Sequence, residues 1–358
     1  MQALSATEAI GPAWDRTRKI LFERFAWRRL LKITAVALLA ELGSLLTFPG
    51  GDGHMRGAHA TSHAGVAAVV AMAAISFLVA VVFFVAGLLL FYFGSRMQLV
   101  LIEVVATRNT HIGPLWAKYG PPTWRWIGLK LILSLVMFIA IIGAAGWMVF
   151  RMVRGMPMPQ RGHLPPGFFA HFAVFFIVVF VVAMFIACLY WMMRDFVAPV
   201  IALENAPLVT ALARLTDLLQ DEPGEVFLYL LLRTVMVLFS VIAGEILLSI
   251  IMVISIIPFG LVGGLLWLLL HHAGPAGMAV LVLAGLVGGV VLGVWFLFLA
   301  IVVFGTICLF YQAFGLYFYG GRYPLLGNLL DPPVVVAQPE TAPLLPPMPL
   351  APEPGGVW

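Results

Sequence analysis

Long runs of apolar residues alternate with shorter polar stretches along most of the chain. A membrane-spanning helix needs about 20 mostly apolar residues, and six of the runs reach that length. They cover residues 30–48, 66–93, 127–150, 168–193, 226–259 and 278–319. The pattern predicts an all-α fold, a polytopic bundle of six transmembrane helices.

The last two runs are longer than one simple crossing requires. Residues 278–319 would form a helix of roughly 63 Å, whereas the hydrocarbon core is about 30 Å thick. We expect this run to turn along the inner surface after Gly305, and Pro258 with Gly260 to end the fifth span. Residues 261–270 are then half-inserted, and the alternative is a bundle of seven spans.

The composition points to the same class of protein. Of the 358 residues, 63% are hydrophobic and 10% are charged, whereas soluble globular proteins are about half apolar and about one quarter charged. The mean hydropathy is +1.07. So few charges exclude a large soluble catalytic domain.

The distribution of lysine and arginine predicts the orientation, because short cytoplasmic loops are enriched in both. With the N-terminus inside, the inner segments hold 16 of the 20 basic residues and the outer connections hold four. We therefore expect a multi-pass protein of the cell (inner) membrane with both termini in the cytoplasm.

The chain divides into three parts. Residues 1–29 form a basic amphipathic cytoplasmic lead, residues 30–319 the bundle, and residues 320–358 a proline-rich and largely disordered cytoplasmic tail. In the second inner connection, leucines at spacings of three and four after Pro207 predict an amphipathic helix over 208–220. Such helices suit the inner membrane interface.

Charges inside the predicted spans are candidates for function, because ionisable groups are costly in hydrocarbon. Glu41 lies in the first span, and Arg233 and Glu245 lie in the fifth. A carboxyl group in a bundle binds a cation, relays a proton, or stays protonated and donates a hydrogen bond to another helix. Arg233 and Lys130 lie near the inner interface, so we expect their side chains to extend toward it.

Histidines gather in the predicted outer connections. They are His54, His59, His63, His163, His271 and His272. Imidazole binds zinc, copper or nickel and titrates near neutral pH, so this group predicts an external metal site or a pH sensor. The alternative is a set of unorganised loop residues.

Three glycines lie on one face of the last span: Gly285, Gly289 and Gly293. Small residues four apart let another helix approach closely. They predict packing within the bundle or a homo-oligomer formed through the last span.

Motifs of the common enzyme classes are missing from the sequence. We find no P-loop, no dinucleotide-binding fingerprint, no metalloprotease helix and no nucleophile elbow. We therefore expect no enzymatic activity, no catalytic residues, no cofactor and no nucleic-acid partner.

Several segments carry a family resemblance. They are residues 14–32 (WDRTRKILFERFAWRRLLK), 95–114 (SRMQLVLIEVVATRNTHIGP), 194–229 and 317–325 (YFYGGRYPL). The chain resembles an uncharacterised family of prokaryotic six-span membrane proteins, distantly similar to the membrane domain of glycerophosphodiester phosphodiesterases. The resemblance implies a helical multi-span fold. It carries over no activity, because the phosphodiesterase catalytic domain is absent from the sequence.

Three hypotheses for the function follow. The first is non-enzymatic membrane organisation, or the binding of lipids or partners. The second is a small-solute or ion transporter, which the regular spacing of the spans and Glu245 favour. The third is an envelope metal or pH sensor built on the outer histidines.

Overall fold

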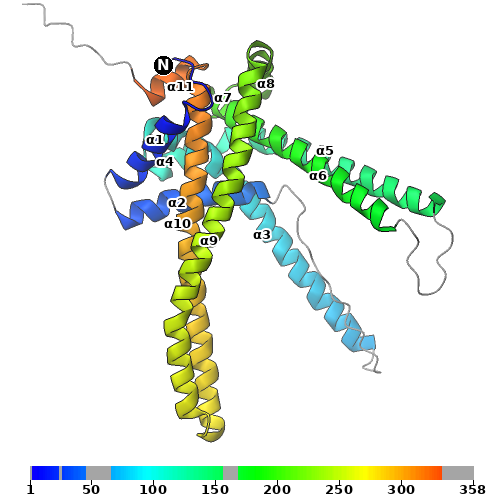
Figure 1. Cartoon of the computed structure of the whole chain (residues 1–358), viewed down its shortest axis with the longest axis vertical. Coiled ribbons are helices and arrows are strands. Elements are labelled where there is room, and N and C mark those ends of the chain that lie inside the picture. The colour runs from blue at the N-terminus through cyan, green and yellow to red at the C-terminus, as the bar shows by residue number, and fades with distance from the viewer. Residues whose placement is uncertain (1, 24–25, 46–65, 156–167, 333–358) are drawn as a thin grey trace, which may run out of the picture.

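The computed structural model describes residues 2–23, 26–45, 66–155 and 168–332, where every regular element is a helix (Figure 1). The elements are α1 (Ile10–Phe22), α2 (Trp27–Leu45), α3 (Val66–Thr107), α4 (Ile112–Lys118), α5 (Gly120–Gly155), α6 (Phe168–Met192), the π-helix η1 (Met193–Val197), α7 (Ala198–Glu204), α8 (Leu208–Asp221), α9 (Pro223–Leu270), α10 (Gly274–Gly320) and α11 (Pro324–Leu330). The predicted all-α fold is confirmed.

The helices form a head and three arms (Figure 1). The arms are residues 66–94 of α3, the α5–α6 pair over 131–155 and 168–185, and the α9–α10 hairpin over 234–304. The head holds the short helices and the adjoining ends of the long ones. The three arms leave the head in different directions, so each arm presents most of its surface outward.

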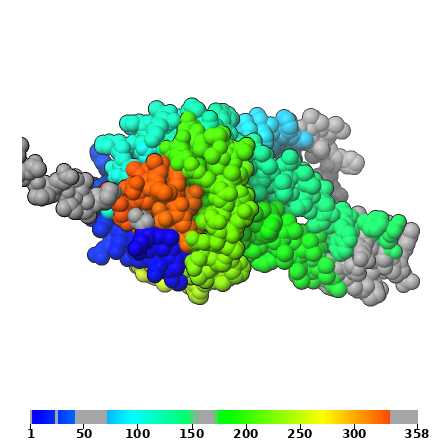
Figure 2. All heavy atoms as spheres, turned by 90° about the horizontal axis from the view of Figure 1, so that it is seen from above, coloured from blue at the N-terminus to red at the C-terminus, as the bar shows by residue number. Residues whose placement is uncertain are grey.

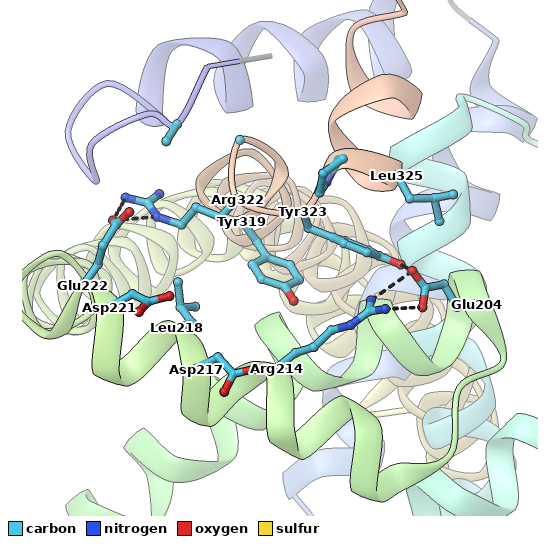
Figure 3. Close-up of a pocket in the computed structure, with 13 residues that line it drawn as sticks. Glu204, Arg214, Asp217, Leu218, Asp221, Glu222, Tyr319, Arg322, Tyr323 and Leu325 are labelled. Carbon is cyan, nitrogen blue, oxygen red and sulfur yellow. Dashed lines mark hydrogen bonds and ion pairs between the residues drawn. The ribbon is translucent and has the colours of Figure 1, made fainter.

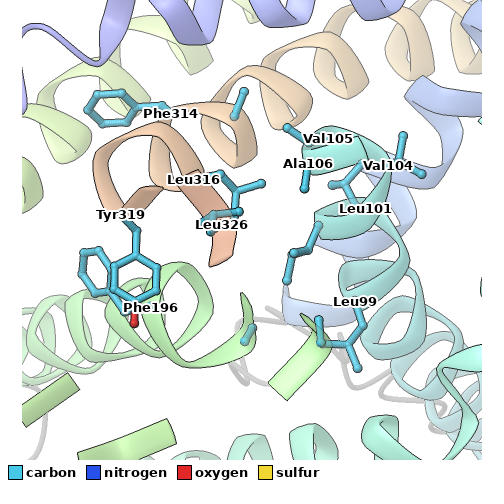
Figure 4. Close-up of a cluster of buried hydrophobic side chains, with 14 of the residues drawn as sticks. Leu99, Leu101, Val104, Val105, Ala106, Phe196, Phe314, Leu316, Tyr319 and Leu326 are labelled. Atoms are coloured by element: carbon cyan, nitrogen blue, oxygen red, sulfur yellow. The ribbon is translucent and has the colours of Figure 1, made fainter. Parts of the chain in front are cut away.

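The buried core lies in the head. The end of α3 supplies Leu101 and Val105, η1 supplies Phe196, and the end of α10 supplies Phe314 and Leu316 (Figure 4). Most of the other core residues also come from the predicted inner connections, 94–126 and 194–225, or from the end of the last predicted span. The sequence segments expected to join the spans therefore build the folded core.

Three short helices form the face of the head that lies opposite the α9–α10 arm. Figure 2 shows α1, α8 and α11 together on this face. The helix predicted over 208–220 is α8, and its Ala211, Leu215 and Leu218 are buried. The polar side chains of Asp217 and Asp221 are exposed.

The arms expose large apolar side chains along their length. Phe83 on α3, Phe180 on α6, and Phe239 and Leu261 on α9 are each more than 60% exposed. Monomeric soluble proteins rarely leave continuous apolar surfaces of this extent uncovered. Another apolar phase or another apolar surface is needed to cover the arms.

Five helices are long and apolar enough to cross a membrane. These segments are Met72–Thr107, Gly120–Met148, Ala173–Glu204, Pro223–Leu270 and Gly274–Gly320. The first predicted span, 30–48, overlaps α2, whose 19 residues include three basic side chains and Glu41. The structure thus supports five of the six predicted spans, and the count of six stays a prediction.

Two predicted breaks in the long helices are wrong. α9 continues through Pro258 to Leu270, and α10 continues through Gly305 to Gly320. Proline removes one backbone donor, whereas unwinding the helix would free several more backbone groups, which would find no water if the helix lay in hydrocarbon. The chain reverses only after Leu270, where Gly274 adopts a φ of +69° that favours glycine.

Gly305 has a different role, which is a close helix crossing. A Cβ atom added there would lie 2.6 Å from the Cβ atom of Thr34 and closer still to its carbonyl oxygen. α2 therefore crosses α10 with its backbone almost against that of Gly305. Glycine is needed at this position because any side chain would clash with α2, and not because the helix has to bend there.

Arg16 fixes α1 to the ends of two other helices. Its guanidinium donates to the carbonyl oxygens of Val105 at 2.9 Å, Ala106 at 2.5 Å and Leu330 at 3.4 Å. Burial lowers the pKa of Arg16, while the carbonyl ends of α3 and α11 favour a cation there. The basic amphipathic lead predicted over residues 1–29 therefore does not expose all of its basic side chains, because Arg16 is only 3% exposed.

Candidate functional site

The head contains a buried polar cluster centred on η1, the single π-turn at the end of α6. This turn carries the consecutive residues Arg194 and Asp195, with 1% and 0% of their surface exposed. Turns of this kind are rare and occur frequently at functional sites. Two adjacent buried charges need partners on other helices, because an unpaired buried charge costs several kcal/mol.

Arg194 binds α2 and α10. Its guanidinium forms an ion pair with Glu41 of α2. It also donates to the amide oxygen of Gln312 on α10, at 3.3 Å from Nε and 3.2 Å from the second terminal nitrogen. One side chain therefore ties η1 to two helices that are remote in sequence.

Asp195 binds α9. Its carboxylate forms an ion pair with Arg233 and accepts a hydrogen bond of 2.6 Å from the Tyr229 hydroxyl. Arg233 donates to the same hydroxyl at 2.6 Å. We call Glu41, Arg194, Asp195, Tyr229, Arg233 and Gln312 the ionic seam. It joins α2, η1, α9 and α10 inside the head.

Gly315 and a stack of rings enclose this part of the ionic seam. A Cβ atom at Gly315 would lie 2.9 Å from the carboxyl carbon of Asp195 and 3.1 Å from the Tyr229 hydroxyl. The rings of Phe314 and Phe318 stack on Tyr229 with centroids 5.0 and 4.5 Å away. The pair between Asp195 and Arg233 is therefore shielded from water.

A second polar group lies between α3 and α5. The Gln98 amide donates to the Ala40 carbonyl at 2.6 Å and to the Tyr190 hydroxyl at 2.8 Å, and it accepts from the Trp126 indole at 2.7 Å. Lys130 donates to the Ser95 hydroxyl at 3.1 Å. This group connects the α3 and α5–α6 arms to α2.

Lys130 has no carboxylate within ion-pair distance among the described residues. Besides Ser95, its ammonium lies 5.4–5.8 Å from the ring centroids of Phe91, Trp126 and Tyr190. Lys130 and the ionic seam together contain three buried cations, Lys130, Arg194 and Arg233. In the part of the chain that the structure describes, only two carboxylates, those of Glu41 and Asp195, lie among them. Lys130 and Arg233 are buried, so our expectation that they extend to the interface is wrong.

This surplus yields a testable prediction for Lys130→Met. Removing a buried cation without a carboxylate partner relieves its desolvation cost, so we expect the free energy of unfolding to stay unchanged or to rise by about 1–3 kcal/mol. Unfolding in mixed detergent micelles measures it, with Lys118→Met as the exposed control. A loss of more than about 3 kcal/mol would show that Lys130 neutralises a buried anion.

The face of the head opposite the α9–α10 arm carries a mixed-charge cleft of about 620 Å³ (Figure 3). Glu204 pairs with Arg214 and accepts from the Tyr323 hydroxyl at 2.7 Å, and Glu222 pairs with Arg322. The hydrogen bond to Glu204 raises the pKa of Arg214. Burial, followed by the bond to Glu204, raises that of Tyr323. Arg214 and Arg322 are therefore already paired with carboxylates of the protein itself.

The structure brings together two of the three predicted intramembrane charges. Glu41 and Arg233 both belong to the ionic seam. Glu245 does not, because it lies exposed on α9, next to Gly244, which packs against Phe304 of α10. The sequence reading missed Arg194 and Asp195, which it assigned to an inner connection, although two charges between apolar runs were a visible signal.

The predicted histidine site is only partly inside the described residues. His54, His59, His63 and His163 lie outside them. At the tip of the α9–α10 arm, the His271 ring stacks on the Trp267 ring, with their centroids 4.4 Å apart. The centroid of the His272 ring lies 3.5 Å from that of His271. Within the described ranges, no three His, Cys, Asp or Glu side chains come close enough to hold a metal ion. The metal and pH hypotheses stay predictions.

The predicted glycine face is open. A Cβ atom at Gly285, Gly289 or Gly293 would meet nothing within 4 Å. Gly285 and Gly289 instead line an apolar groove of about 920 Å³ between α9 and α10. The expected packing against another helix of the bundle is not seen in the described part of the chain, and the homo-oligomer stays a prediction.

Comparisons with known proteins give a family but no activity. No curated protein and no solved structure matches the chain. The similarity to the membrane domain of glycerophosphodiester phosphodiesterases stays a prediction. A match to the Family of unknown function (DUF7544) covers residues 4–329, which include every residue of the ionic seam. The chain belongs to this family.

Proposed function

We propose that the chain is a multi-pass membrane protein with a non-enzymatic role, in which the arms bind lipids or partner helices and the head holds the arms in place. The observation that carries this proposal is the contrast between the two parts. In the head, the buried charges of the ionic seam form ion pairs. The arms, in contrast, expose Phe83, Phe180 and Phe239. Side chains of this kind are stable when lipid tails or apolar helices cover them.

The ionic seam explains how one head supports three separate arms. The arms contribute little packing to one another, so their directions depend on the head. Arg194 and Asp195 connect the α5–α6 arm to α2, α9 and α10, and Gln98 connects α3 to Tyr190 and Trp126. Buried ion pairs fix one arrangement, because any other leaves charges unpaired.

The proposal includes six spans in the cell (inner) membrane and both termini in the cytoplasm. The head contains both α1 and α11, and Arg322 near the end of α10 donates to the Leu4 carbonyl at 2.9 Å. The two described ends of the chain therefore lie together. The excess of lysine and arginine in head segments favours the cytoplasmic side.

Photo-crosslinking tests the proposal directly. Benzophenone side chains placed at Phe83, Phe180 and Phe239 should form adducts with lipid or with a membrane partner in native membranes. Val209, which is 78% exposed on α8 in the head, is the matched control and should give no lipid adduct. Lipid adducts at Val209, or none at the three arm positions, would contradict the proposal.

A transporter is the second candidate, and one observation favours it. Asp195 Oδ1, Arg233 Nε and Gln312 Nε2 are buried and have no hydrogen-bond partner among the described residues. Ionisable groups between membrane helices frequently mark ion pathways. In proteoliposomes, Gln312→Leu, which removes one of these unpartnered groups, should then reduce an ion flux that the wild type supports. Unchanged flux, or no flux in the wild type, rejects this candidate.

A further inference from the structure

A polar cleft of about 310 Å³ lies between the end of α1, the start of α2 and the turn that joins α3 to α4. It is lined by Glu23, Arg29, Arg108, Asn109, Thr110 and His111. It is separate from the ionic seam, with which it shares no residue. Two guanidinium groups and one imidazole thus face a single carboxylate, and this balance suits an anion.

The two arginines keep donors available. Arg29 is half-buried, and its Nε has no hydrogen-bond partner among the described residues. The Arg108 side chain is exposed and forms no hydrogen bond or ion pair with any other described residue. In contrast, Arg16, Arg96, Arg125, Arg194 and Arg322 all donate to named oxygens. The cleft therefore gathers guanidinium donors that the fold itself does not use.

The turn that carries Arg108 is fixed by its own side chains. The Asn109 N–H donates to the Thr107 hydroxyl at 3.3 Å, and the His111 N–H donates to the Asn109 side-chain oxygen at 3.0 Å. Arg108 has a φ of +59°, in the left-handed region that disfavours long side chains. The two hydrogen bonds on either side of Arg108 stabilise its left-handed backbone conformation.

The surface beside the cleft combines basic and aromatic side chains. On α1, Trp14, Arg18 and Phe22 follow one another at four-residue steps and are all exposed. At the start of α2, Trp27 and Arg28 are exposed as well. Basic and aromatic residues together are typical of a helix that contacts an anionic membrane surface.

Two ring contacts connect this surface to an apolar helix. The rings of Trp14 and Phe310 lie 6.1 Å apart, and those of Trp27 and Phe298 lie 6.3 Å apart. Both phenylalanines belong to α10, which is long and apolar enough to span a membrane. If the cleft holds the charged group of a ligand, the apolar helix α10 lies beside it, where hydrocarbon chains of the same ligand could pack.

We infer that this cleft binds the phosphate of an anionic phospholipid, with Arg29 and Arg108 as its donors and the α1–α2 surface beside its chains. The inference rests on the proposed membrane function and names one of its lipids by class. Free phosphate has the same head chemistry, but it makes no use of the exposed rings of Trp14 and Trp27. Glu23 opposes the phosphate and limits the affinity.

Native mass spectrometry of the full chain in mild detergent tests the inference. Short-chain phosphatidylglycerol should bind at least tenfold more tightly than short-chain phosphatidylcholine. The double variant Arg29→Gln/Arg108→Gln should lose this preference, while Glu23→Gln should strengthen phosphatidylglycerol binding several-fold. Lys118→Gln removes a positive charge from the neighbouring helix α4 and is the matched control, for which we expect no change.

Three outcomes would overturn the inference. One is equal binding of the two lipids, and another is an unchanged preference in the double variant. The third is displacement of phosphatidylglycerol by equimolar inorganic phosphate, which would assign the cleft to the free ion. If the double variant unfolds, Arg108→Glu alone repeats the test at an exposed residue. Lipid adducts on the arms without a phosphatidylglycerol preference would reject this inference and leave the proposed function intact.

Discussion

Asp195→Asn is expected to lower the free energy of unfolding by about 3–5 kcal/mol, because it removes one partner of a buried ion pair and leaves Arg233 uncompensated. The substitution keeps the shape of the side chain, so the loss reports charge and not packing. Arg233 and Tyr229 would each lose the carboxylate that they share. Unfolding in mixed detergent micelles measures the change.

Two variants make this result specific. Glu245→Gln neutralises an exposed carboxylate on the same helix as Arg233, and we expect a change within about 0.5 kcal/mol. Asp195→Leu combined with Arg233→Met removes both charges and should recover much of the lost stability. If Asp195→Asn is as mild as Glu245→Gln, the ionic seam does not hold the head together.

Gly305→Ala is expected to have an effect of similar size by a different mechanism. The added methyl group would occupy the position of the Thr34 backbone, so α2 has to move away from α10. Displacing α2 also pulls Glu41 from Arg194. Overpacking alone costs about 1–3 kcal/mol, and we expect more than 3 kcal/mol because the ionic seam opens as well.

Gly293→Ala is the matched control in the same helix. A methyl group there meets nothing within 4 Å, and alanine favours a helix over glycine by up to about 1 kcal/mol. We expect equal or slightly higher thermal stability for this variant, with a clear drop for Gly305→Ala. A similar midpoint for both variants would show that the close crossing of α2 and α10 is not needed.

Hydropathy alone predicted most of the helical layout. The run 168–193 matches α6, and the leucine spacing over 208–220 matches α8. These features are local, because a helix and its buried face follow from residues three and four apart. The same reasoning located Glu41 and Arg233 as unusual, since a charge in an apolar run is costly wherever its partner lies.

The partners of these charges were beyond a single sequence. Arg194 and Glu41 are 153 residues apart, and Arg194 and Gln312 are 118 apart. Only the packing of four helices brings them together. The function of Gly305 was misread for the same reason, because hydropathy does not show which backbone approaches a glycine. The π-turn at Met193–Val197 likewise leaves no hydropathy signal.

In the proposed function, the arms cross a membrane while the head stays on one side of it. Impermeant maleimide labelling of single cysteines in sealed vesicles tests this claim most directly, after replacement of Cys188 and Cys308 by serine. Gln220→Cys lies in the head and Ala273→Cys at the tip of the α9–α10 arm, and both positions are exposed. We predict labelling from opposite sides, with Gln220→Cys accessible from the cytoplasmic side. Labelling of both positions from the same side would contradict the account.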